Sequence, residues 1–67
     1  MTIIFSNCII NTDQYGLIYG TEDGLCFENL DGAHIIRDVP DDALQQIAVA
    51  KAEGKPYIEM EGKVVVE

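Results

Sequence analysis

The chain has 67 residues and a mass of 7.4 kDa, which allows one small domain and no second one. Hydrophobic residues make up 48% and charged residues 24% of it, which excludes a disordered, collagen-like or low-complexity chain. Twelve acidic residues oppose four basic ones and give a net charge of −8 at pH 7. This charge argues against a bare polyanion or an anionic membrane surface as the partner, because like charges repel.

The first residues carry no signal for export or membrane insertion. Residues 1–10 contain no Lys or Arg, whereas a secretory signal needs a positively charged start and a small-residue cleavage site. Apolar stretches have four residues or fewer, so no segment spans a bilayer. We therefore expect a cytoplasmic protein. There Cys8 and Cys26 are expected to be reduced core residues, and a disulfide between them stays open.

Residues 2–38 predict four strands. The first, residues 2–10, is rich in β-branched side chains. Asp23-Gly24 and Asp31-Gly32 indicate two-residue turns, because glycine accepts the positive φ that such turns require. An antiparallel meander follows from these turns, with a polar turn at residues 11–16 and strands at 17–20, 25–30 and 33–38.

Counting outward from the two turns predicts register and faces. Leu30 then pairs with Ala33, and Phe27 pairs with Ile36. Side chains alternate between the two faces of a sheet. The face expected to be buried carries Phe27, Ile36, Leu25 and Ile18. The other face is predicted to be amphipathic and half solvated, and it carries Leu17, Tyr19, Leu30, Ile35, Glu28 and Arg37.

Residues 39–54 predict a helix. Pro40 suits the first helical position, where no N–H is needed, and Gly54 suits the C-terminal stop. Asp41 and Asp42 complement the positive end of the helix dipole, and Lys51 complements the negative end. The predicted apolar stripe consists of Leu44, Ile47 and Ala48, with Ala43 and Ala50 beside them.

The C-terminal segment predicts a third hairpin, with strands at 55–60 and 63–67 around a Glu61-Gly62 turn. This hairpin places Ile58 opposite Val65 and Tyr57 opposite Val66. The element order predicts an α+β fold: a curved antiparallel sheet, made of the meander plus the C-terminal hairpin, with one α-helix packed on one face. Whether residues 2–10 pair with the second strand or with the C-terminal hairpin stays open.

Residues that could support catalysis or metal binding do not form a known pattern. No nucleophile elbow, phosphate-binding glycine loop or HExxH is present, so we predict no enzyme and no cofactor. Residues 11–22 partly match an EF-hand calcium loop, but predicted strands flank them where the motif needs helices. Cys8, Cys26 and His34 match no zinc spacing. We predict no metal site, and His34 is expected to be a partly buried strand residue.

The acidic residues are unevenly spread along the chain. Five acids and no Lys or Arg precede Arg37, whereas seven acids and four bases follow from Arg37 onward. Most acids of the first part fall at predicted turns or strand ends, where they are exposed. Asp38, Asp41 and Asp42 lie at the predicted helix start, and Glu59 and Glu61 lie on one side of a predicted strand.

Two interpretations fit this distribution. One is solubility, since a net charge of magnitude about 8 keeps a small domain soluble and Asp-Gly turns need Asp in any case. The other is that carboxylates on a rigid sheet imitate nucleic-acid phosphates, so that the protein binds a basic groove and blocks it. The predicted partner-binding residues are Asp13, Glu22, Asp23, Glu28, Asp31, Asp38, Asp41, Asp42, Glu59 and Glu61.

In size, charge and element order the whole chain resembles the small acidic phage-encoded anti-CRISPR proteins. These proteins share no motif, so no functional residue carries over from them. The resemblance implies a Lys/Arg-rich subunit of a type I CRISPR effector complex as the partner. It implies steric and electrostatic competition with target DNA as the mechanism.

The alternative interpretation is a homo-oligomeric structural or assembly module, or an antitoxin-like accessory subunit without an inhibitory role. It rests on the predicted C-terminal strand at residues 64–66, an edge that could pair with a second copy. In either case we expect a monomer or homodimer that binds a protein, without direct contact to nucleic acid or membrane.

Overall fold

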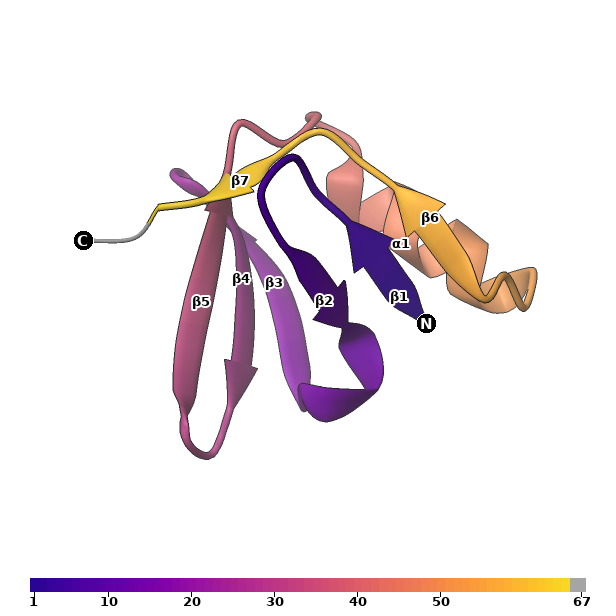
Figure 1. Cartoon of the computed structure of the whole chain (residues 1–67), viewed down its shortest axis with the longest axis horizontal. Coiled ribbons are helices and arrows are strands. Elements are labelled where there is room, and N and C mark those ends of the chain that lie inside the picture. Colours follow the sequence, from indigo (N-terminus) through magenta and orange to yellow (C-terminus); the bar gives the residue numbers. More distant parts are fainter. Residues whose placement is uncertain (66–67) are drawn as a thin grey trace.

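The computed structural model describes residues 1–65 and has the predicted α+β class (Figure 1). The helices are a short 3-10 helix at Thr12–Gln14 and one α-helix, α1, at Ala43–Ala52. The strands are β1 (Thr2–Ile4), β2 (Ile9–Asn11), β3 (Leu17–Thr21), β4 (Gly24–Asn29), β5 (Gly32–Arg37), β6 (Tyr57–Glu59) and β7 (Lys63–Val64).

The strands form two sheets where the sequence predicted one. The three-stranded sheet has the order β2-β1-β6, with β1 and β2 antiparallel and β1 and β6 parallel. The four-stranded sheet has the order β3-β4-β5-β7 and is antiparallel throughout. The meander forms most of the second sheet, so this part of the predicted topology is confirmed.

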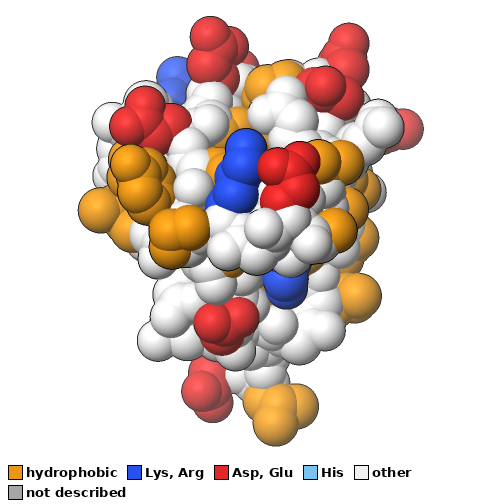
Figure 2. All heavy atoms as spheres, turned by 90° about the vertical axis from the view of Figure 1, so that its right-hand side faces the viewer, with side chains coloured by type: hydrophobic (Ala, Val, Ile, Leu, Met, Phe, Trp, Pro, Cys, Tyr) orange, Lys and Arg blue, Asp and Glu red, His pale blue; other side chains and the backbone are white. Residues whose placement is uncertain are grey.

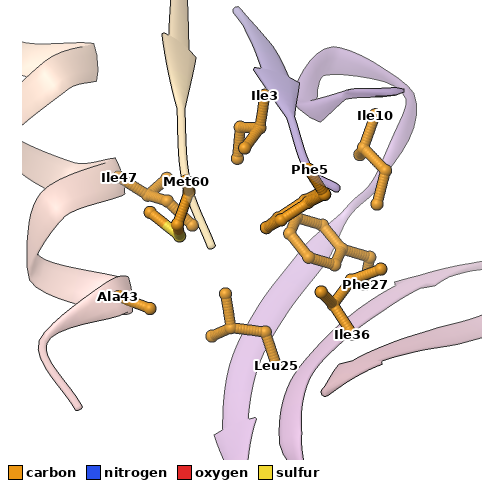
Figure 3. Packing of buried hydrophobic residues seen from close by; sticks show 9 residues of the cluster. All are labelled: Ile3, Phe5, Ile10, Leu25, Phe27, Ile36, Ala43, Ile47 and Met60. Carbon is orange, nitrogen blue, oxygen red and sulfur yellow. The ribbon is translucent and has the colours of Figure 1, made fainter. Parts of the chain in front are cut away.

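The core lies between the two sheets and α1 (Figure 3). Ile3 and Ile10 come from the three-stranded sheet, and Phe27 comes from the centre of the meander and is fully buried. Its ring makes edge contacts with Phe5, at 6.2 Å between ring centroids, and with Tyr15, at 5.7 Å. The buried cluster is completed by Leu25, Ile36, Ala43, Ile47 and Met60.

The prediction that residues 2–10 form one strand is wrong. These residues fold into the β1–β2 hairpin, in which the Phe5 N–H donates to the Cys8 carbonyl at 2.9 Å. Ser6 and Asn7 lie at the tip of this hairpin, and both residue types favour turns. The β-branched residues on either side favour a strand, so the sequence predicted one continuous strand and missed this turn.

The predicted meander register is wrong by two residues, although its buried face is right. The loops are Glu22-Asp23 and Leu30-Asp31, so Phe27 pairs with His34 and Leu25 pairs with Ile36. The glycines that were assigned to the loops begin the returning strands, with φ of +143° at Gly24 and +149° at Gly32. A shift of two keeps every side chain on its face. The predicted inner residues Leu25, Phe27 and Ile36 are buried, and Ile18 is half buried.

Helix α1 begins at Ala43, three residues after Pro40. Its end is as predicted: Gly54 has φ +73°, its N–H donates to the Lys51 carbonyl, and the Lys55 N–H donates to the Ala50 carbonyl. The predicted stripe is partly wrong, because Leu44 and Ala48 are exposed. The buried positions are Ala43, Ile47 and Ala50, which follow one face at the helical spacing.

The predicted C-terminal hairpin is wrong. β6 pairs with β1, so that Ile58 lies beside Ile3, whereas β7 pairs with β5 and places Val64 beside Ile36. Ile58 therefore does not face Val65, and the predicted Tyr57–Val66 pair lies partly outside the described residues. The Glu61-Gly62 segment crosses from one sheet to the other, because Gly62 is buried against Ile36, Val39 and Phe5 and leaves no room for a tight turn.

Side-chain amides and hydroxyls join the two sheets where β7 meets the β1–β2 hairpin. The Ser6 N–H and hydroxyl both donate to the Gly62 carbonyl, at 2.8 and 2.7 Å. The Asn7 side chain donates to the Val64 carbonyl at 2.8 Å and accepts from the Val64 N–H at 2.9 Å. Asn7 thus occupies the outer edge of β7 as a short strand would.

Candidate functional site

Three connections bring acidic side chains together at one end of the molecule, the upper end in Figure 1. These are the β3–β4 turn, the β5–α1 connection and the β6–β7 connection. Two contacts link them: Gly62 lies against Val39, and Lys63 forms an ion pair with Asp38. We call the acidic residues of these connections the acidic rim; they are Glu22, Asp23, Asp38, Asp41, Asp42 and Glu61, all exposed.

Four of the six residues of the acidic rim line a groove of about 370 Å³, whereas Asp42 and Glu61 do not line it. One wall is the β3–β4 turn with Glu22 and Asp23, and the other is the β5–α1 connection with Asp38 and Asp41. Figure 2, turned by 90° about the vertical axis, shows acidic side chains over the upper part of that face, with basic ones among them and further acidic ones at the lower end. Residues 15 to 19 positions apart in the sequence therefore share one surface.

Local hydrogen bonds hold the two walls in shape. The Thr21 hydroxyl donates to the Gly24 carbonyl at 3.2 Å and accepts from the Asp23 N–H at 3.1 Å, which fixes the β3–β4 turn. Asp38 has φ +61°, a left-handed conformation that a short polar side chain tolerates, and it turns the chain from β5 toward α1. The hydrogen bonds of Thr21 therefore fix the turn that carries Glu22 and Asp23, and the conformation of Asp38 sets the direction of the facing wall.

Few partners neutralise the rim within residues 1–65. Asp38 pairs with the Lys63 ammonium at 3.4 Å, and Asp42 accepts a hydrogen bond from the Gln46 amide at 2.7 Å. In this part of the chain Glu22, Asp23, Asp41 and Glu61 take part in no ion pair. A cationic surface that binds this end of the molecule would pair with exposed carboxylates that have no ion-pair partner among the described residues.

The other predicted site residues lie elsewhere. Asp13 is exposed and binds the N-terminal ammonium at 3.2 Å. Glu28 and Asp31 line a separate groove near the β4–β5 turn, at the opposite end of the meander. Glu59 lies on β6, whereas Glu61 follows in the connection, so the two do not alternate along one strand as predicted. Six of the ten predicted residues form the rim, and four do not.

The outer face of the meander holds a polar cluster that sequence reasoning missed. The Tyr19 hydroxyl donates to the Glu28 carboxylate at 3.1 Å, and Tyr19 is paired with Cys26 across β3 and β4. The neighbouring Cys26 thiol and the Glu28 carboxylate raise the pKa of Tyr19 to about 12, because both disfavour a phenolate beside them. The sequence had placed Tyr19 and Glu28 on the same face, and the correct register adds that Cys26 lies directly opposite Tyr19.

The metal sites weighed from the sequence gain no support from the structure. Asn11, the first position of the calcium-like loop, accepts a hydrogen bond from the Asp13 N–H and caps the 3-10 helix. Within residues 1–65 no three His, Cys, Asp or Glu side chains are placed to hold a metal ion. Cys8 and Cys26 are both free thiols. His34 is exposed, not partly buried as predicted, and its ring lies edge-on to Tyr15 at 6.3 Å.

Comparison with known proteins identifies no relative. No family model matches the sequence, and neither a curated protein nor a solved structure matches the chain. Separately, none of the helices in residues 1–65 has the length and apolar character needed to cross a membrane.

Proposed function

We propose that this chain binds a basic, nucleic-acid-binding protein surface through the acidic rim and blocks that surface by imitating DNA. The observation that carries the proposal is the convergence of six exposed carboxylates on one rigid end of the molecule, with one ion pair among residues 1–65 to offset them. The chain acts as a binding protein in this proposal and not as an enzyme.

Competition with DNA needs a negative surface that keeps its shape. Three connections anchored by the core and by local hydrogen bonds supply that shape, so little conformational entropy is lost on binding. A Lys/Arg-rich groove attracts such a surface from a distance, and the attraction weakens as salt is added. Once this chain occupies the partner's groove, a DNA duplex cannot enter it, so binding by itself causes inhibition.

The resemblance to small anti-CRISPR proteins makes a DNA-binding subunit of a type I CRISPR effector complex the first partner to test. In this proposal the protein acts in the cytoplasm of a bacterial host cell, where such complexes meet their target. Size, charge and element order support this choice of partner, and no shared motif does.

Charge reversal at two matched places tests the proposal. Glu22→Lys/Asp23→Lys reverses the rim at the β3–β4 turn, and Glu28→Lys/Asp31→Lys reverses the opposite end of the meander with the same change in net charge. Each immobilised protein is exposed to a bacterial lysate and to a purified type I effector complex, and the retained protein is then assayed for binding of labelled duplex DNA.

We expect the wild-type chain to retain a DNA-binding protein and to prevent its binding of DNA. Rim reversal should weaken this binding by about tenfold or more, and reversal at the opposite end by about threefold or less, because charges at the contact matter most. Equal loss in both variants would show a general charge effect and would contradict a rim-centred interface. Retention of the partner without inhibition would contradict the competition with DNA.

A homo-oligomeric or accessory module remains the second candidate, favoured by the outer face of the meander. Leu17, Tyr19 and Ile35 are exposed on that face, with exposed fractions of 53, 37 and 39%. The edge first considered for self-pairing is less suited to it, because Asn7 already bonds both backbone groups of Val64. Sedimentation that shows a dimer at micromolar concentration, lost in Leu17→Lys, would support this second candidate.

A further inference from the structure

A groove lies between α1 and β6. It has a volume of about 590 Å³, within the range of ligand pockets. One wall is the α1 face that carries Asp42, Gln46 and Val49, and the other wall is β6 with Tyr57 and Glu59. Figure 2 looks onto this side of the molecule and shows hydrophobic side chains between charged ones.

The β6 strand presents an unpaired edge to this groove. β6 is the last strand of the order β2-β1-β6, and it pairs with β1 on one side only. The Thr2 N–H donates to the Pro56 carbonyl at 3.1 Å, and the Met60 N–H donates to the Ile4 carbonyl at 3.0 Å. Since backbone groups alternate in direction along a strand, the N–H and C=O groups of Tyr57 and Glu59 point away from β1.

No hydrogen bond among residues 1–65 uses these outward groups of Tyr57 and Glu59. An edge of this kind is a template on which another extended chain can add as a strand. The edge is short, about 10 Å for three residues, so it fits a short peptide segment better than a whole sheet.

The side chains around the groove indicate what such a segment carries. Asp42 and Glu59 supply negative charge, and Lys55, the basic residue in the lining, is already paired with Glu53 at 3.7 Å. Val49 and Tyr57 are 47 and 57% exposed and offer apolar contacts. A strand that carries both basic and apolar side chains matches these features, because Tyr57 and Glu59 lie two positions apart on β6 and share one face.

We propose that the groove between α1 and β6 binds an extended basic segment of the partner protein, which adds to β6 as a fourth strand of the three-stranded sheet. The inference rests on the proposed function for the expectation that the partner is basic, and the groove gives that partner a second contact that shares Asp42 with the acidic rim. Main-chain hydrogen bonds give affinity, and Asp42 and Glu59 select Lys or Arg.

A labelled, end-capped hexapeptide of alternating Arg and Val is the probe. Binding is measured by fluorescence anisotropy, and the contact is mapped on the wild-type chain by backbone amide chemical shifts. Control peptides replace Arg by Glu, or carry N-methyl groups on the Val nitrogens or on the Arg nitrogens. Because an added strand uses one of its two edges, one of the two N-methylated peptides should lose binding.

Three single variants separate backbone pairing from charge. Glu59→Pro removes the outward N–H without removing a bond to β1, a change that edge strands tolerate. Glu59→Gln removes the charge alone, and Asp31→Asn is the charge-matched control at the opposite end. We expect Glu59→Pro to weaken peptide binding by about tenfold, Glu59→Gln by about threefold and Asp31→Asn by less than about twofold.

The inference is overturned if the wild-type chain does not bind the Arg-Val peptide, if the shifts fall outside residues 42–50 and 57–59, or if both N-methylated peptides bind normally. Self-association that maps to the groove would assign it to a second copy and would also overturn the proposal. Failure of the peptide experiment leaves the proposed function standing if charge reversal at Glu22 and Asp23 still abolishes inhibition. If the peptide binds as expected but charge reversal at Glu22 and Asp23 leaves inhibition unchanged, the proposed function is wrong and the proposal for the groove stands.

Discussion

The two sheets of this molecule are encoded in different ways. The meander β3-β4-β5 is held by pairings between neighbouring strands, each closed by a two-residue loop. The sheet β2-β1-β6 depends on the contact of β1 with β6, in which Ile3 meets Ile58 from the far end of the chain. The meander therefore depends on local turn chemistry, whereas the other sheet depends on core packing and on the joint around Gly62.

We expect the largest loss in the free energy of unfolding from Gly24→Ala, a substitution at the first residue of β4. Gly24 has φ +143°, and a Cβ there would collide with the carbonyl oxygen of Ile36 on β5. We expect a loss of about 3 kcal/mol or more in the free energy of unfolding, measured by urea titration.

Gly32→Ala is the matched control, because Gly32 has φ +149° but no atom within 4 Å of the added Cβ. It should lose only about 1–2 kcal/mol from backbone strain. Equal losses at both glycines would show that backbone conformation, and not the contact with β5, sets the requirement at Gly24.

Gly62→Ala tests the joint between the sheets. An added Cβ would lie 2.8 Å from Ile36 Cγ2 and Val39 Cγ1 and 3.0 Å from Phe5 Cδ1, at φ +146°. We expect a loss of about 2–3 kcal/mol, with hydrogen-exchange protection falling more in β1 and β6 than in β3 and β4. A uniform loss of protection would contradict a separate role for this joint.

Asn7→Ala removes the side chain that bonds both backbone groups of Val64. The expected cost is about 1–2 kcal/mol in thermal or urea unfolding, because two hydrogen bonds are lost at an exposed position. Asn29→Ala, which removes one side-chain bond to the Asp31 N–H within a local turn, should cost about half as much or less. If Asn29→Ala costs more, the contrast between local and long-range joints is wrong.

The smallest effect concerns Tyr19 on the outer face of the meander. In the variant Tyr15→Phe/Tyr57→Phe, absorbance at 295 nm should report a Tyr19 pKa of about 12, and Cys26→Ala or Glu28→Gln should lower it. Since the folded pKa lies above the ordinary value of 10, this contribution to stability is complete below pH 10 and is lost as the pH rises to 12. A titration midpoint near 10 would contradict the arrangement of these three side chains.

The contrast between the sheets also explains what the sequence could predict. Phe27, Ile36 and Leu25 were predicted on the buried face, because a register error of two preserves the alternation of side chains. The C-terminal hairpin was predicted wrongly, since Glu61-Gly62 looks like a local turn and only the packing of Gly62 between the sheets shows otherwise. Gly54 predicted where α1 ends. Which face of α1 is buried could not be predicted, because it depends on which other elements pack against the helix.

In the candidate site, too, local features could be predicted from the sequence and long-range packing could not. Asp23 and Asp41 were identified as surface acids from their turn and helix-start positions. Their assembly into one rim depends on how the β3–β4 turn and the β5–α1 connection meet, which no local pattern encodes. The groove beside β6 was also beyond prediction, because β6 had been paired with β7 in the expected hairpin.

The central claim is that the acidic rim makes the contact with a basic partner, and the salt dependence of binding tests it most directly. The binding constant for the retained partner is measured by calorimetry from about 50 to 300 mM salt for the wild type, Glu22→Gln/Asp23→Asn and Glu28→Gln/Asp31→Asn. The account predicts a steep fall with salt that flattens in the rim variant and keeps its slope in the other, because neutralised contacts no longer respond to screening. Identical slopes for all three proteins would contradict it.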